Sequence, residues 1–336
     1  MSDVFATSFG VLNYSGMLFD KGNAETPFSS LIGARAKTTN HVEFTTGQEY
    51  TSGGGAQPAI SETASLTAPD ATVVTRTQKT NVTQIFQYSV GISYGKMSNM
   101  GTLSGLNVAG QEPNPMSELD FQVAQKIKQC NNDIEYTFIN GVYNKATSDA
   151  TINKTRGMVT AITSNVKAMA GAQLGIWDIA DLLKTIGAGN APIEGLILWC
   201  DPVTYMQVNG DAQANGMTVY EADRSVNGIR LSRVITPLGD VYLRIGKYLP
   251  SGTALLINPN VIAPVFQPVP GKGNFFLEEL AKTGAGSKYQ LFGQIGLDHG
   301  PEWYHGKFTG IATTFTPPAG RNVVVAGGSI TTTSGT

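Results

Sequence analysis

Residues 114–143 read NPMSELDFQVAQKIKQCNNDIEYTFINGVY, and this stretch decides the fold of the 336-residue chain. Its apolar residues recur every three or four positions, which places them on one stripe of a helix. They are Met116, Leu119, Val123, Ile127, Cys130, Ile134 and Phe138. Asn114 suits a helix cap, Pro115 a first helical position and Gly141 a helix end. Such a helix would be about 40 Å long, well beyond the average of about three turns, so we predict a spine on which other elements pack.

The composition favours a protein that meets other surfaces. Charged residues make up 14% of the chain and the net charge is −2, which argues against the basic patch that tight nucleic-acid binding needs. No apolar run is long enough for a membrane span and no secretion signal opens the chain, so we expect a soluble protein made in the cytosol. The many Gly, Thr, Ser, Asn and Gln residues suit an assembly protein, and a monomeric β protein is the alternative.

The segment before the helix predicts an arm and a long β loop. In residues 26–33, Pro27 makes Thr26 extended and Gly33 ends the segment, which we expect to anchor an N-terminal arm on an apolar surface. Residues 41–50 alternate as a strand, and the β-branched and aromatic run 71–93 returns as a second strand or strand pair. The tip between them has almost no large apolar groups. Such an arm has too little core to be stable alone and must rest on this chain or on another copy.

The segment after the helix predicts a mixed domain of α/β or α+β character. Residues 155–162 read as a turn into a short strand, and 176–186 as an amphipathic helix with Trp177, Ile179, Ala180, Leu183 and Ile186 on one side. Leu196–Cys200 reads as a buried strand, followed by a helical turn at 203–208. Further strands are predicted at 229–235, 240–245, 253–257, 274–280, 288–296 and 309–315.

One catalytic pattern is present, Gly91-Ile92-Ser93-Tyr94-Gly95, which fits the nucleophile elbow of serine hydrolases. The elbow requires a packed helix directly after the serine. Residues 97–110 contain several glycines and no helical stripe, so we interpret Ser93 as part of a strand. A serine hydrolase that uses Ser93 stays the alternative from another class.

Metal and cofactor sites are not predicted. The chain has three histidines, His41, His299 and His305, and the last two lie near Asp298 and Glu302. The surrounding Gly and Pro residues indicate an irregular loop, so we interpret these histidines as ordinary surface residues rather than metal ligands. Cys130 and Cys200 stand alone and are predicted to be core residues. Phosphate-loop and dinucleotide patterns are missing, and we expect no cofactor.

Charged residues on or near the predicted β arm are candidates for a contact between subunits. They are Glu43, Glu49, Glu62, Arg76 and Lys79. A solvated strand edge would have the same sequence, so both interpretations stay open.

The order of these elements resembles the major capsid proteins of tailed bacteriophages, with the HK-ninety-seven-like fold and most closely its SU-ten-like branch. The matching motifs are Thr26-Pro27-Phe28 with Ile32-Gly33, Val42–Thr46, Asn81–Ile85 with Val90–Ser93, Asn132–Glu135 with Phe138–Gly141, Thr155–Met158 and Leu280–Gly284. Two features depart from the family: Phe44 stands where its strand often has a tryptophan, and the tail beyond Pro317 has no counterpart.

The resemblance implies an α+β chain divided into six segments. They are an N-terminal arm (1–40), an extended β loop (41–93), a peripheral domain with the spine helix (94–155), an α/β axial domain (156–300), a return to the peripheral domain (301–316) and a flexible or added tail (317–336).

It also implies the function of a structural protein without catalysis. Copies would self-assemble as pentamers and hexamers into an icosahedral head shell around phage DNA, in the virion, after assembly in the host cytoplasm. The expected partners are other copies of the chain, portal, scaffold or decoration proteins, and packaged DNA through weak non-specific proximity, with no membrane. An encapsulin-type compartment shell is the alternative within the assembly class.

Overall fold

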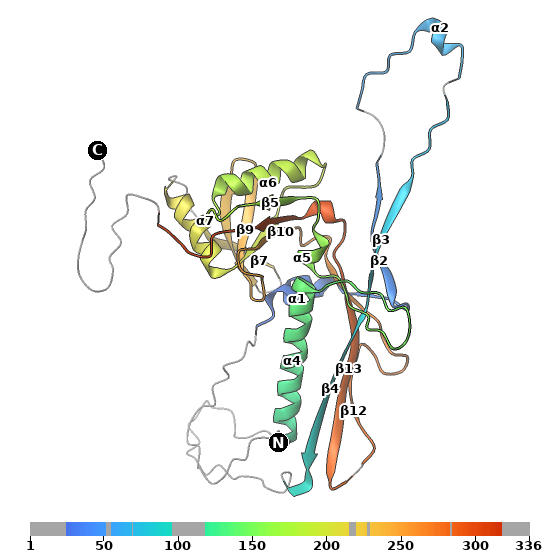
Figure 1. Ribbon diagram of the computed structural model, residues 1–336, viewed down its shortest axis with the longest axis vertical. Helices are drawn as coiled ribbons and strands as arrows, with labels where there is room; N and C mark the ends of the chain where they lie inside the picture. The colour runs from blue at the N-terminus through green and yellow to red at the C-terminus, as the bar shows by residue number, and fades with distance from the viewer. Residues whose placement is uncertain are drawn as a thin grey trace, which may run out of the picture.

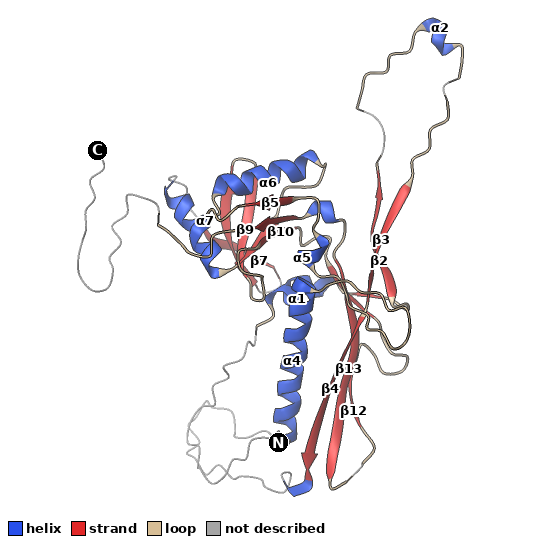
Figure 2. Ribbon diagram, in the orientation of Figure 1, coloured by secondary structure: helices blue, strands red, loops and turns tan. Residues whose placement is uncertain are grey.

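The computed structural model describes residues 25–51, 55–68, 70–95, 118–214, 220–226, 229–282 and 284–317. Three parts are visible in Figure 1. A body of strands and helices lies at one end of the long helix α4 (Glu118–Asn140), and a long sheet runs beside that helix. A two-stranded β arm projects from their junction in the opposite direction to the long sheet. Figure 2 shows strands in the long sheet and at the base of the arm, loop in the outer arm, and most helices in the body and the spine.

The helices and strands follow the chain in this order. The other helices are α1 (Pro27–Ile32), α2 (Glu62–Ser65), α5 (Met158–Ala161), α6 (Ile176–Ala188) and α7 (Pro202–Ala214), with 3-10 turns η1 (Gly33–Arg35) and η2 (Glu302–Tyr304). The strands are β1 (Lys37–Thr38), β2 (Glu43–Tyr50), β3 (Arg76–Val82), β4 (Gln84–Ser93), β5 (Val166–Ala168), β6 (Leu196–Cys200), β7 (Tyr220–Val226), β8 (Ile229–Thr236), β9 (Gly239–Ile245), β10 (Ala254–Ile257), β11 (Ala263–Phe266), β12 (Phe275–Glu279), β13 (Gly286–Asp298) and β14 (Gly306–Thr309).

The body is built on a seven-stranded sheet of order β5-β14-β10-β6-β9-β8-β7. Its central strand β6 reads LILWC, and all five residues are buried, as expected for a strand covered on both faces. Leu196, Leu198 and Cys200 face a core formed with α6 and α7. Ile197 and Trp199 face a second core formed with α1 and α4. The uninterrupted apolar run therefore joins the body to the spine.

The spine helix packs on the face of a five-stranded sheet whose longest ladder pairs β4 with β13, from Gln84 against Ile295 to Ser93 against Gly286. The predicted stripe is buried only in its C-terminal half, at Cys130, Ile134 and Phe138, whereas Ile127 is 45% exposed. The helix ends before Gly141, where a Cβ atom would lie 2.4 Å from the carbonyl oxygen of Thr155. Only glycine fits this crossing, which confirms the predicted helix end.

The N-terminal anchor is the short helix α1, which begins after the non-helical Thr26 and ends at Ile32, before Gly33. Pro27 occupies the first turn of α1, and Phe28, Leu31 and Ile32 are fully buried, which confirms the apolar anchoring. Thr26 provides no side-chain cap. Instead, Glu135 of α4 accepts hydrogen bonds from the N–H groups of Phe28 (2.8 Å) and Ser29 (2.7 Å). A carboxylate at a helix N-terminus is favoured by the free N–H groups and by the helix dipole.

Other local predictions need correction. Residues 158–161 form helix α5 instead of a strand, the helix after β6 runs to Ala214, and the last strand is β14 rather than 309–315. Trp177 is 60% exposed because it lies beside, not on, the buried stripe of α6. Cys130 and Cys200 are buried as predicted. The predicted helix start at 114–117, residues 1–24, the glycine-rich stretch 97–110 and the tail beyond Pro317 lie outside the described residues.

Each of the two sheets contains strands from separate parts of the chain. β11, β12 and β13 share the sheet of β4, whereas β14 joins the sheet of the body. The division of the chain into six segments stays a prediction. Within the described ranges, every helix is too short or too polar to serve as a membrane span.

Candidate intersubunit surface at the β arm

The β arm (43–82) is a two-stranded ladder that opens into an unpaired tip. β2 and β3 pair from Glu43 against Val82 to Tyr50 against Arg76. Beyond this ladder, the described residues of the tip contain the helical turn α2, which Ser61 caps by accepting a hydrogen bond from the Ala64 N–H. Large apolar side chains are nevertheless exposed there: Ile60, Leu66, Val73 and Val74, with Leu66 and Val73 each 85% exposed. Several exposed apolar side chains on a projecting arm favour a contact with another molecule.

The base of the arm is held rigidly by the buried side chain of Asn81. Its amide nitrogen donates to the carbonyl oxygens of Leu297 (2.7 Å) and Arg156 (3.2 Å), and its oxygen accepts from the Arg156 N–H (2.8 Å). These partners come from β13 and from the loop after α4. Because the Asn81 side chain is fully buried, loss of these bonds would leave its polar groups unpaired. The direction of the arm is therefore fixed where it leaves the subunit.

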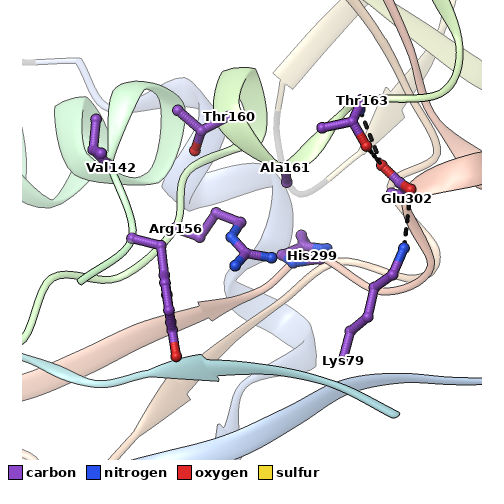
Figure 3. Close-up of a pocket in the computed structure, with 9 residues that line it drawn as sticks. Lys79, Val142, Arg156, Thr160, Ala161, Thr163, His299 and Glu302 are labelled. Carbon is purple, nitrogen blue, oxygen red and sulfur yellow. Dashed lines mark hydrogen bonds and ion pairs between the residues drawn. The ribbon is translucent and has the colours of Figure 1, made fainter. Parts of the chain in front are cut away.

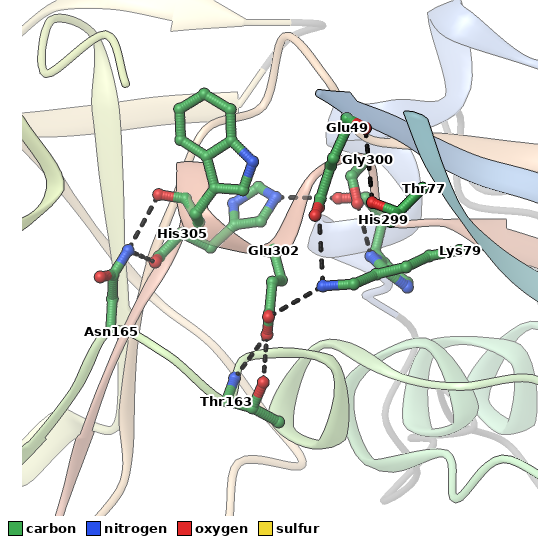
Figure 4. A network of polar contacts seen from close by, with 10 residues as sticks. Glu49, Thr77, Lys79, Thr163, Asn165, His299, Gly300, Glu302 and His305 are labelled. Atoms are coloured by element: carbon green, nitrogen blue, oxygen red, sulfur yellow. Dashed lines mark hydrogen bonds and ion pairs between the residues drawn. The ribbon is translucent and has the colours of Figure 1, made fainter. Parts of the chain in front are cut away.

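A second polar network surrounds Lys79 (Figure 4). The Lys79 Nζ atom lies 2.9 Å from Glu302 Oε1 and 3.5 Å from Glu49 Oε1. The other Glu302 oxygen accepts hydrogen bonds from the N–H and the hydroxyl group of Thr163. Burial opposes the charge of Lys79 and of Glu302, but their contacts outweigh it, so the pKa of Lys79 is raised and the pKa of Glu302 is lowered. Both groups stay charged at neutral pH.

The structure gives three of the five predicted contact residues a partner within the chain. Besides Lys79 and Glu49, Glu43 pairs with Lys145 at 2.5 Å and accepts from the Thr80 hydroxyl, and these hydrogen bonds lower the pKa of Glu43. Glu62 and Arg76 lie exposed on the outer arm. That the five residues contact a neighbouring subunit stays a prediction.

Sequence reasoning missed the partners that hold the arm. Glu302, Thr163 and Lys145 come from segments far along the chain from β2 and β3, and no local pattern marks them. In the sequence, Asn81 stands out only as the first residue of the Asn81–Ile85 motif. An asparagine between Thr80 and Val82 carries no signal of its role, because its partners are backbone groups of distant segments.

The interpretation of His299 and His305 as surface residues is wrong, because both are buried. The loop 299–305 lies between the two cores and joins β13 to β14. His305 Nδ1 accepts a hydrogen bond from the Asn258 N–H (3.1 Å), and its Nε2 donates to the His299 carbonyl oxygen (2.8 Å). Burial lowers the pKa of His305 to about 4. His305 is therefore a neutral structural residue. His41 is exposed, as predicted.

A cavity of about 420 Å³ lies beside the arm base (Figure 3). The Arg156 guanidinium group lies 4.6 Å above the ring of Tyr143 and points toward His299. The hydroxyl groups of Thr160 and Thr163 already donate to Gly141 and Glu302. Both hydroxyl groups are therefore held in hydrogen bonds within the subunit. No group of three or more metal-ligating side chains occurs in the described part of the chain.

Ser93 lies far from every histidine. It pairs with Gly286 at one end of the β4–β13 ladder, while His299 follows Asp298 at the other end of β13. Twelve strand residues at about 3.3 Å each separate these ends by about 40 Å. His41 precedes β2, whose first residue pairs with Val82 at the same distant end. Since a nucleophilic serine needs a base within hydrogen-bond reach, this geometry does not support a hydrolase.

Comparisons with known structures agree with this architecture. The chain is similar to the holo-SrpI encapsulin complex of Synechococcus elongatus PCC 7942 (TM-score 0.59, 10% identity, covering 91% of this chain and 96% of that one). It is also similar to the capsid of Myoviridae phage XM1 (TM-score 0.57, 12% identity, covering 91% of this chain and 99% of that one). A third similar structure is the capsid of cyanophage A-1(L) (TM-score 0.57, 10% identity, covering 93% of this chain and 100% of that one). At these identities the likeness shows the fold, and the predicted HK-ninety-seven-like α+β fold is confirmed.

Sequence comparison identifies the family. No curated protein matches the chain. The family model described as the SU10 major capsid protein matches residues 1–312, almost the whole sequence. The chain belongs to the SU10 major capsid protein family.

Proposed function

We propose that this chain is the shell subunit of a tailed-phage head. Copies assemble as pentamers and hexamers into an icosahedral shell that encloses phage DNA, and the protein has no catalytic activity. The β arm is the observation that carries this proposal. It projects from the subunit, exposes Ile60, Leu66, Val73 and Val74 at its tip, and has a base held by Asn81 and Lys79. An arm aimed rigidly outward with an uncovered apolar tip fits a contact with a neighbouring copy.

The low charge of the chain supports the same role. A net charge of −2 leaves no strong attraction for packaged DNA, so DNA is held by enclosure rather than by binding. We further infer location in the virion after assembly in the host cytoplasm, with portal, scaffold or decoration proteins as additional partners. In this assignment, α4 with the sheet of β4 and β13 forms the peripheral domain, and the seven-stranded body forms the axial domain.

An encapsulin-type compartment is the second candidate, and its support is the TM-score of 0.59 to the encapsulin chain. At 10% identity this likeness concerns the fold. The two candidates differ in what the shell encloses, because an encapsulin holds cargo protein and a phage head holds DNA.

Expression of the full chain followed by particle sizing and negative-stain imaging tests the proposal. We expect closed shells of uniform size. A stable monomer with esterase activity that Ser93→Ala abolishes would contradict it and favour the hydrolase. Particles purified with a co-expressed cargo protein would favour the encapsulin.

A further inference from the structure

The ring of His299 is 1% exposed, and only one of its two nitrogens is hydrogen-bonded. Its Nδ1 atom lies 2.7 Å from the Gly300 carbonyl oxygen. A carbonyl oxygen only accepts, so Nδ1 carries the proton and donates. Burial lowers the pKa of His299, which keeps the ring neutral at pH 7. Nε2 is therefore an acceptor, and this buried atom has no donor among the described residues. A buried acceptor without a partner costs free energy.

His299 lines the cavity of about 420 Å³ at the arm base, together with Arg156 (Figure 3). One water molecule occupies about 30 Å³ of liquid, so the cavity has room for a polyatomic ion. The Arg156 guanidinium group stacks on the ring of Tyr143 at 4.6 Å and points toward His299. It has no carboxylate partner within the described part of the chain. A cation without a counter-ion therefore lies beside an acceptor without a donor.

The subunit itself holds both groups in place. The Arg156 N–H donates to the Asn81 side-chain oxygen (2.8 Å), and the Arg156 carbonyl oxygen accepts from the Asn81 amide (3.2 Å). Stacking on Tyr143 orients the guanidinium group, and the bond to Gly300 orients the ring of His299. Since these side chains are already ordered, a ligand would lose little affinity to their immobilisation.

The ligand that complements this pair is an anion that also has a hydroxyl group. Arginine binds oxyanions through two parallel N–H···O bonds, whereas a neutral Nε2 atom requires a donor. Hydrogen phosphate provides both, because it keeps a proton at neutral pH beside its charged oxygens. Sulfate and the phosphodiester groups of DNA have no such proton and would leave Nε2 unpaired.

Two carboxylates near the cavity would repel an anion, and both contact Lys79. The Lys79 Nζ atom lies 2.9 Å from Glu302 Oε1 and 3.5 Å from Glu49 Oε1. The other Glu302 oxygen accepts from the Thr163 N–H at 3.0 Å and from its hydroxyl group. These contacts offset part of the negative charge. Selective binding therefore depends on the pair of Arg156 and His299 rather than on a strong positive field.

We propose that this cavity binds one hydrogen phosphate ion. The charged oxygens of the ion accept from the Arg156 guanidinium group, and its hydroxyl group donates to His299 Nε2. Arg156 lies in the loop after α4 and His299 in the loop between β13 and β14, so the ion joins these two loops at the base of the arm. All residues that line the cavity belong to one chain, and the inference does not depend on the proposed assembly.

Isothermal titration calorimetry of the full chain at pH 7 and constant ionic strength tests this site. The titrants are inorganic phosphate, sulfate and dimethyl phosphate. Sulfate is a similar tetrahedral anion without the proton, and dimethyl phosphate represents the DNA backbone. We expect saturable binding of phosphate and binding of the other two that is weaker by about tenfold or more, because they leave a buried acceptor unpaired.

Two variants separate the roles of the two groups. His299→Asn keeps an amide that can donate to the Gly300 carbonyl oxygen and removes the Nε2 acceptor, so it is expected to bind phosphate and sulfate equally. Arg156→Gln removes the charge and is expected to abolish binding of both ions. His41→Asn and Arg76→Gln make the same exchanges at exposed positions and should keep the preference for phosphate.

The unsubstituted chain alone can contradict the inference, so the test stands even if a variant fails to fold. Absence of saturable phosphate binding, or equal affinity for the three ions, would overturn it. A preference for phosphate that persists in a folded His299→Asn variant would do the same. Each of these results would leave the proposed function intact, because particle formation is measured separately.

Discussion

Single polar residues determine how the parts of this subunit are held together. Asn81 and Lys79 fix the arm at its base through bonds to β13, to the loop after α4 and to Glu302. His305 fills the same role between the two cores, where it accepts from Asn258 and donates to His299. Each of these side chains is satisfied only in the folded arrangement. Their removal therefore affects the geometry of the subunit more than its surface.

His305 makes the stability of the subunit dependent on pH. Its pKa is about 4 in the fold and 6.5 ordinarily, so the unfolded chain binds the proton first as pH falls. The contribution of His305 to the free energy of unfolding is fully present above pH 6.5 and is lost as the pH falls toward 4. Between pH 7 and pH 5 the loss is about 2 kcal/mol. Protonation also removes the acceptor for the Asn258 N–H.

Denaturant unfolding of the His305→Asn variant at the two pH values checks this prediction. The variant is expected to be less stable at pH 7 and to show a smaller difference between pH 7 and pH 5. His41→Asn, at an exposed position, is the control. Its free energy of unfolding should change between pH 7 and pH 5 as much as that of the unsubstituted chain. If the free energy of unfolding changed equally with pH in the unsubstituted chain and in the His305→Asn variant, His305 would not be the source of the pH dependence.

At the scale of elements, α1 is attached to α4 by one carboxylate. Glu135 takes the place of the missing cap of α1 and also accepts from the Ser29 hydroxyl group. Burial raises the pKa of Glu135, and three hydrogen bonds oppose that effect. Phe28 packs edge-on against Trp199 at 5.6 Å, so α1 also contacts the sheet of the body. Helix α1 is thereby joined to the spine helix and to the sheet of the body within one core.

Glu135→Ala is expected to lower the free energy of unfolding by about 2–4 kcal/mol, because it leaves two buried N–H groups unpaired and creates a cavity. Thermal unfolding measures the loss, and limited proteolysis near Thr26 should become faster. Gln129→Ala on the exposed side of α4 is the control, with an expected change within about 0.5 kcal/mol. An unchanged melting temperature for Glu135→Ala would show that the cap is not needed.

At the scale of the whole molecule, folding and assembly use different parts of the chain. The two cores contain residues from α1, α4, α6, α7 and both sheets. No residue of the arm tip belongs to either core among the described positions. The subunit is therefore complete without its tip, while the tip alone has no core.

Deletion of residues 53–69 should accordingly leave the subunit folded and impair assembly. We expect a melting temperature close to that of the full chain, together with loss of particles in negative-stain images. Since the described residues of this segment are exposed, their removal exposes no buried surface. Normal particles from the deleted chain would show that the tip carries no contact between copies.

Local sequence patterns were sufficient to predict the elements whose conformation depends on neighbouring residues in the chain. The long helix, its end at Gly141, the buried strand Leu196–Cys200 and the two strands of the arm follow from periodicity, glycine placement and β-branched runs. The order of these elements also carried the family resemblance that the comparison confirms.

Only the tertiary structure decided which surfaces are covered and which partners are shared. It turned the segment at Pro27 into a helix because Glu135, more than 100 residues away, caps it. It buried His299 and His305 because their loop lies between two cores. It left Ile127 45% exposed although the helix stripe predicts its burial. These outcomes depend on contacts between distant segments, and a local pattern contains no information on which distant segment arrives.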